Sequence, residues 1–95
     1  MSNSPHTDLH HVLTFARKHT YTTAGQAWQK IIASLVFETK VDLSLISHFD
    51  EHDQARLFNI LDAFMSKQLR VEEISAVYLE LFPHPEDWRV EGWEN

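Results

Sequence analysis

Histidine is the residue type with the most evident chemical potential in this chain, since seven occur in 95 residues. The sharpest pair is His48 and His52, whose i, i+4 spacing on one helix could place two imidazoles on a shared metal ion. Asp53 would add a carboxylate oxygen. A predicted helix boundary at Asp50 separates the two imidazoles, and histidines that flank a helix cap usually face solvent. Exposed histidines are therefore the favoured interpretation, with a metal site at His48, His52 and Asp53 as the alternative.

The sequence carries no recognisable catalytic constellation. Ser47, His48 and Asp50 are the residue types of a hydrolytic triad, but residues this close in sequence cannot form its in-line hydrogen bonds. There is no nucleophile elbow and no glycine loop for phosphates, and two glycines are too few for most cofactor loops. The absence of cysteine excludes thiol catalysis and iron–sulfur sites. We expect a protein that is not an enzyme and needs no cofactor.

Charge is unevenly distributed along the chain. Residues 41–95 hold four basic and twelve acidic residues, a net charge of −8 within the −6 of the whole sequence. Binding to nucleic-acid phosphates needs clustered Lys and Arg, and no such cluster exists, so direct nucleic-acid binding is not expected. A partner with a basic surface would suit the acidic half better. Protonation of all seven histidines would move the formal charge from −6 to +1, which leaves pH sensing as a further alternative.

The C-terminal segment, about residues 83–95, differs in composition from the rest of the chain. It combines two tryptophans with several carboxylates, and protein interfaces favour aromatic anchors surrounded by charges. The predicted partner-binding residues are Trp88, Trp93, Glu86, Asp87 and Glu91. The alternative for Trp88 is that it packs back over the helices and belongs to the core.

The first half of the chain shows two segments with helical periodicity. Ser4-Pro5 offers an N-cap followed by proline at the first helical position, and the apolar spacing behind it predicts a helix over residues 6–19. A second helix follows a short connector, with Thr23 and Gln26 in the pattern of a capping box. Gly25 in its first turn is small enough to admit a neighbouring helix. The predicted apolar face of this second helix comprises Ala24, Ala27, Trp28, Ile31, Ile32, Leu35 and Val36.

The second half predicts three further helices. Residues 41–49 alternate apolar and polar like a strand, but no second strand candidate exists to pair with them. We therefore expect a short helix capped by Asp42, with Leu43, Ile46 and Phe49 facing inward. Asp50 caps the next helix, whose predicted apolar stripe is Leu57, Phe58, Leu61, Phe64 and Met65. A last helix over about 70–82 ends at Pro83, with inward residues Val71, Ile74, Val77, Tyr78, Leu81 and Phe82.

Together these patterns predict one all-α domain over residues 1–95: a compact bundle of four to five short helices with an irregular C-terminal strap. No stretch approaches the roughly 20 apolar residues of a membrane span, and no secretory signal is evident, so a cytoplasmic protein without membrane contact is expected. The predicted function is a small acidic protein-binding module, such as an adaptor, inhibitor or regulatory subunit. A self-associating helical protein is the remaining alternative, and it would bury an additional apolar face.

Overall fold

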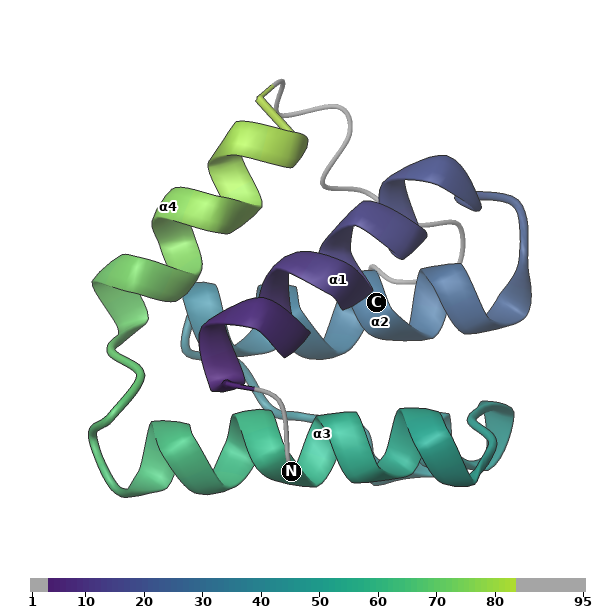
Figure 1. Cartoon of the computed structure of the whole chain (residues 1–95). Helices are drawn as coiled ribbons and strands as arrows, with labels where there is room; N and C mark the ends of the chain where they lie inside the picture. The colour runs from purple at the N-terminus through teal and green to yellow at the C-terminus, as the bar shows by residue number, and fades with distance from the viewer. Residues whose placement is uncertain (1–3, 84–95) are drawn as a thin grey trace.

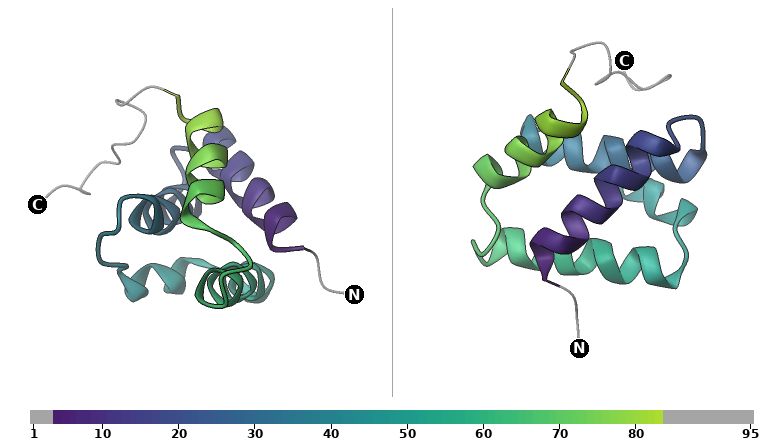
Figure 2. Two further views of the ribbon diagram at one scale, coloured as in Figure 1. Left: turned by 90° about the vertical axis from the view of Figure 1, so that its left-hand side faces the viewer. Right: turned by 45° about the horizontal axis from the view of Figure 1, so that its top comes forward.

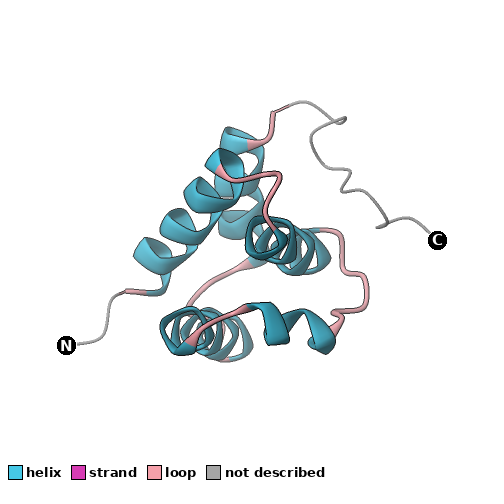
Figure 3. Cartoon of the chain, turned by 90° about the vertical axis from the view of Figure 1, so that its right-hand side faces the viewer, coloured by secondary structure: helices cyan, strands magenta, loops and turns pink. Residues whose placement is uncertain are grey.

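The computed structural model describes residues 4–83, and every regular element in that range is a helix (Figures 1 and 3). The described part contains no strand, which confirms the predicted all-α class. None of its helices is both long enough and apolar enough to cross a membrane. The predicted strap lies almost wholly outside the described residues. The elements in chain order are α1 (Pro5–Lys18), α2 (Thr23–Val36), the 3₁₀ helix η1 (Leu43–His48), α3 (Glu51–Met65) and α4 (Val71–Leu81).

Helix α1 is the element around which the others are arranged. It begins as predicted, because the Ser4 hydroxyl accepts a hydrogen bond from the Thr7 amide at 3.2 Å and Pro5 occupies the first helical turn. One face of α1 packs against α2, α3 and α4, and the views in Figure 2 show it crossing the bundle diagonally. That face consists of Leu9, Val12, Leu13 and Ala16, which recur at helical spacing and are all buried.

The corner between α1 and α2 is tight and corrects one prediction. The N-cap of α2 is Thr22, not Thr23: its backbone is extended and its hydroxyl oxygen accepts the Gly25 amide hydrogen at 3.0 Å. Gln26 does not complete a capping box, because its side chain donates to the Thr20 carbonyl. The His19 carbonyl accepts from both the amide and the hydroxyl of Thr22, which draws the end of α1 onto the first turn of α2.

Segment η1 links α2 to α3 and closes the core over Trp28. It starts at the predicted cap, where Asp42 accepts the Ser44 amide hydrogen at 3.0 Å, but it forms a 3₁₀ helix of six residues. Phe49 at its end is buried as predicted and stacks on Trp28, with ring centroids 4.3 Å apart. Ile46 is half-buried against the same core.

Helix α3 begins as predicted but is rotated relative to the expected stripe. Asp50 caps it by accepting the Asp53 amide hydrogen at 2.8 Å. Phe58 and Met65, predicted to face inward, are exposed. Leu57 is buried as predicted, and Leu61 and Phe64 are partly buried at the edge of the core, whereas Ile60 and Ala63 are buried without having been predicted. The Asn59 side chain donates a hydrogen bond to the Asp8 carboxylate of α1 at 2.7 Å.

Helix α4 closes the bundle against α1 and α2, as its apolar spacing predicts. Ile74, Tyr78 and Phe82 are fully buried, and the rings of the last two stack at 5.0 Å. The Glu73 carboxylate accepts the Arg70 amide hydrogen at 2.9 Å and so satisfies a free donor at the start of the helix. The helix ends two residues before Pro83.

The tight corner predicts that Gly25→Ala destabilises the protein. A Cβ at this position would lie 2.1 Å from the His19 carbonyl oxygen, a backbone atom that cannot move without shifting the end of α1. We expect a loss of about 1–3 kcal/mol in the free energy of unfolding, as for other overpacked sites, measured by urea denaturation. Helix propensity alone would give the opposite sign, a gain of about 1 kcal/mol.

The matched control is Thr23→Ala, a substitution at an exposed residue two positions before Gly25, which should change stability by less than about 0.5 kcal/mol. A Gly25→Ala variant as stable as the parent chain, or more stable, would show that the corner is looser than described.

Candidate functional site

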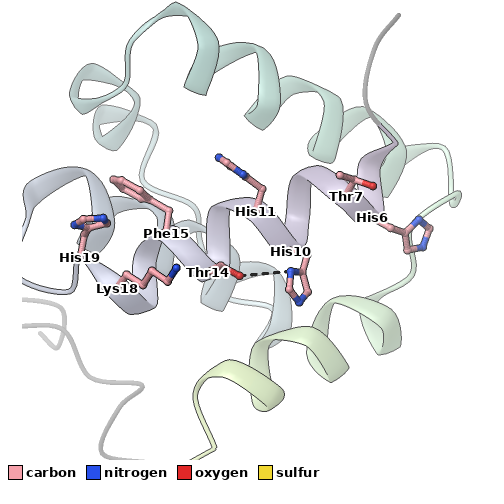
Figure 4. Close-up of a pocket in the computed structure, with 8 residues that line it drawn as sticks. All are labelled: His6, Thr7, His10, His11, Thr14, Phe15, Lys18 and His19. Atoms are coloured by element: carbon pink, nitrogen blue, oxygen red, sulfur yellow. Dashed lines mark hydrogen bonds between the residues drawn. The ribbon is translucent and has the colours of Figure 1, made fainter.

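The outward side of α1 carries four of the seven histidines. Figure 4 shows them around an open pocket that runs along the helix. His6 and His10 extend toward α4, whereas His11 projects toward the other side of α1. The pocket is lined by His6, Thr7, His10, His11, Thr14, Phe15, Lys18 and His19.

Three of these histidines have partners that give them structural roles. His6 Nε2 lies 2.7 Å from the Glu73 carboxylate and ties the start of α1 to the start of α4. The ring of His10 shares a hydrogen bond of 3.4 Å with the Thr14 hydroxyl, one turn further along α1. His19 packs on Phe15, with ring centroids 4.6 Å apart. The surface is thus rich in titratable nitrogen.

The predicted alternative metal ligands do not share a helix. His48 is the last residue of η1 and His52 the second of α3, with Asp50 capping α3 between them. Both imidazoles are exposed. Asp53 is engaged by Arg56 at 3.3 Å. Across residues 4–83, no group of three or more His, Asp or Glu side chains is placed to hold a metal ion.

The outer side of α3 presents an uncovered apolar surface. Phe58 is 56% exposed and Met65 is 74% exposed, although both belong to the residue types that normally fill a core. Between them lie Leu61, which is half-buried, and Asp62, which is exposed. The spacing of i, i+3 and i+7 puts the three side chains in one row along the helix. We call Phe58, Leu61 and Met65 the α3 face.

A groove continues from the C-terminal end of this face. Met65 lies at the junction, because it belongs both to the α3 face and to the wall of the groove. The groove runs between the ends of α2 and α3 and the start of α4, with an apolar floor and two residues of each charge at its rim. Its lining residues are Leu35, Glu38, Phe64, Met65, Lys67, Leu69, Arg70, Val71 and Glu72.

Two helices end at this groove with the same uncommon backbone geometry. Glu38 after α2 and Lys67 after α3 have positive φ angles of 56° and 67°, in the region that glycine favours. Each occupies the left-handed position of a Schellman motif. The diagnostic bonds run from the Thr39 amide to the Ser34 carbonyl at 3.0 Å and from the Gln68 amide to the Ala63 carbonyl at 2.9 Å.

Sequence reasoning missed the α3 face for an identifiable reason. The five predicted stripe residues of α3 lie within about 120° of the helix circumference, but Ile60 and Ala63 lie beyond that arc and are the residues that the core covers. Apolar residues on two sides of one amphipathic helix were the available signal. The predicted interface residues Trp88, Trp93, Glu86, Asp87 and Glu91 lie outside the described residues.

Replacing Glu38 by glycine should stabilise the protein. A residue with a side chain costs about 1–2 kcal/mol in the left-handed region, and glycine removes this cost. Glycine also makes the unfolded chain more flexible, which offsets part of the gain, so a net stabilisation of about 0.5–1 kcal/mol is expected. Thermal unfolding followed by circular dichroism measures it. Thr39→Gly is the matched control: its φ is not positive, so glycine there should lower the melting temperature. Two shifts of the same sign would contradict the assignment of strain to Glu38.

The Glu73 carboxylate should make the free energy of unfolding decrease as the pH falls into the acid range. Its pKa lies below the ordinary 4.5, first because it accepts the Arg70 amide hydrogen and second because His6 is bonded to it. A depressed folded-state pKa gives stability that is complete above about pH 4.5 and is lost as the pH falls through the folded value. Glu73→Gln should therefore be less stable than the parent chain at neutral pH, and the difference should disappear in acid.

Chemical denaturation at a series of pH values tests this. Glu72→Gln is the control, because it removes an equal charge from an adjacent exposed residue that makes neither bond. A Glu73→Gln deficit that persists unchanged at low pH would refute the role given to the charged carboxylate.

Comparisons with known proteins do not assign the chain to a family. The chain matches no protein-family model, and comparisons with curated proteins and with solved structures find no match. Its function must be argued from its surfaces. Of the two surfaces, the pocket on α1 includes His6 and His10, which make bonds within the fold, whereas the α3 face exposes the apolar side chains of Phe58 and Met65 to water.

Proposed function

We propose that this chain is a non-catalytic protein-binding module, an adaptor, inhibitor or regulatory subunit that docks onto a protein partner. The observation that supports this best is the α3 face. Two large apolar side chains in one row, more than half exposed, cost free energy in water that a partner would recover by covering them. Aromatic residues and methionine are enriched at the centres of protein interfaces.

The groove beside Met65 extends the proposed surface. Its apolar floor offers a place for a partner side chain. Its rim carries two basic residues, Lys67 and Arg70, and two acidic residues, Glu38 and Glu72. Rim charges of both signs would orient a partner more than they would strengthen binding. The surface thus combines an apolar row, a recess and a polar rim, which is the usual composition of an interface.

The composition of the chain and the bonds of its histidines are also consistent with the proposal. A protein without cysteine is suited to a reducing compartment such as the cytoplasm. Within residues 4–83 the hydrogen-bonded histidines pair with a carboxylate or a threonine in ways that stabilise the fold. The acidic C-terminal half remains the part that would attract a basic partner surface.

The proposal predicts that Phe58→Lys combined with Met65→Lys reduces partner binding at least tenfold. Both side chains are exposed, so the substitutions should leave folding nearly intact while placing two charges in the centre of the interface. The measurement is quantitative affinity capture from the extract of the protein's own host, at low and moderate salt, followed by titration with the purified partner. The matched control is Tyr21→Lys, which alters an aromatic side chain that is 97% exposed on the α1–α2 connector.

A second variant, Trp88→Ala with Trp93→Ala, tests the predicted C-terminal residues in the same assay. Loss of binding in this variant alone would assign the interface to the C-terminal segment and remove it from α3. If every variant captures the same proteins as the parent chain, neither surface is a docking site.

A further inference from the structure

We infer that the α3 face fits a second copy of this chain, paired antiparallel along α3 about a twofold axis near Phe58. The inference goes beyond the proposed function, since it assigns the same surface to self-association, which the sequence analysis kept as the alternative. Its starting point is the lack of cover: among the described elements, α1 alone makes an extended contact with α3, and it does so on the opposite side. Figure 1 shows α3 along the lower edge of the bundle.

The charges at the two ends of α3 make this helix complementary to itself. Its first turn carries Glu51 and Asp53, and the turn after its last residue carries Lys67, with Arg70 three positions further on. A parallel pair would place like charges together at both ends. An antiparallel pair places the acidic end of each copy beside the basic end of the other, and it also opposes the two helix dipoles favourably.

The spacing along α3 agrees with this arrangement. Glu51 precedes Phe58 by two turns, about 10 Å, and Met65 follows it by the same distance. With the axis at Phe58, the two phenylalanine rings meet at the centre and each Met65 lies near Glu51 of the second copy. Lys67, just beyond Met65, then comes within reach of that Glu51 carboxylate. The interface has the two Phe58 rings at its centre, the exposed Asp62 one turn from each ring, and one acid–base pair at each end.

The size of the face sets the expected strength. Stable dimers bury about 800 Å² on each partner, and three side chains with part of the adjoining groove cover less than that. The pair should therefore be weak and reversible, with a dissociation constant in the micromolar to millimolar range. Such a pairing would also shield the exposed apolar row at high local concentration.

Sedimentation equilibrium of the full chain from micromolar to millimolar concentration tests the inference. The weight-average mass should rise from 11.1 kDa towards twice that value, and Phe58→Lys should hold it at the lower value throughout. Glu51→Lys and Lys67→Glu should each weaken pairing about three- to tenfold, because each sets like charges opposite one another at both ends. Glu80→Lys makes the same charge change on the exposed side of α4 and should pair like the parent chain.

The decisive arm is an equimolar mixture of Glu51→Lys and Lys67→Glu. In an antiparallel pair containing one copy of each, both ends regain opposite charges, so the mixture should associate more strongly than either variant alone. This result does not depend on the stability of a single variant. A mixture no more associated than its components would overturn the antiparallel pairing, as would a parent chain that stays at 11.1 kDa.

The failure of this inference can be distinguished from the failure of the proposed function. A monomeric parent chain whose capture of another protein depends on Phe58 and Met65 would show that the α3 face binds a different partner. A monomeric chain whose captured proteins are unaffected by those substitutions would refute both.

Discussion

The attachment of α3 to the bundle is the constraint on which the arrangement of exposed surface depends. Among the described elements α3 has one extended partner, α1, and the contact includes a partly buried polar bond: the Asn59 amide donates to the Asp8 carboxylate at 2.7 Å. Asp8 is only 4% exposed, so its carboxylate depends on bonds within the fold. Together with the burial of Leu57, Ile60 and Ala63, this bond is consistent with a rotation of α3 that leaves Phe58 outside.

The two sides of α1 differ in their surroundings. The apolar side packs against α2, α3 and α4, which bury Leu9, Val12, Leu13 and Ala16. The outward side carries His6, whose bond to Glu73 ties α1 to α4. Among the described residues, Phe58 and Met65 on the outer side of α3 remain exposed. The proposed docking role of α3 and the structural role of His6 are both consistent with this packing arrangement.

The sequence was sufficient for the elements but not for the rotation of α3. Ser4, Asp42 and Asp50 were identifiable as caps because capping is a local interaction between a side chain and the next backbone amides. The cap of α2 was misplaced by one residue, since adjacent threonines offer the same hydroxyl and only the contact with His19 decides between them. Phe58 was assigned to the core because helical spacing shows that residues share a side but not which side a neighbour covers. That choice depends on Asp8 and Asn59, which are far apart in the chain.

The most direct test follows the Met65 methyl group by nuclear magnetic resonance. With ¹³C-labelled methionine methyl groups, the Met65 signal reports on the proposed interface, and the Met65 signal of the Phe58→Lys variant is the reference. Pairing through α3 predicts that the Met65 signal of the parent chain shifts and broadens as the protein concentration rises, while that of the variant stays in place. A Met65 signal that is unchanged up to millimolar concentration would contradict the claim that the uncovered side of α3 is where a second copy binds.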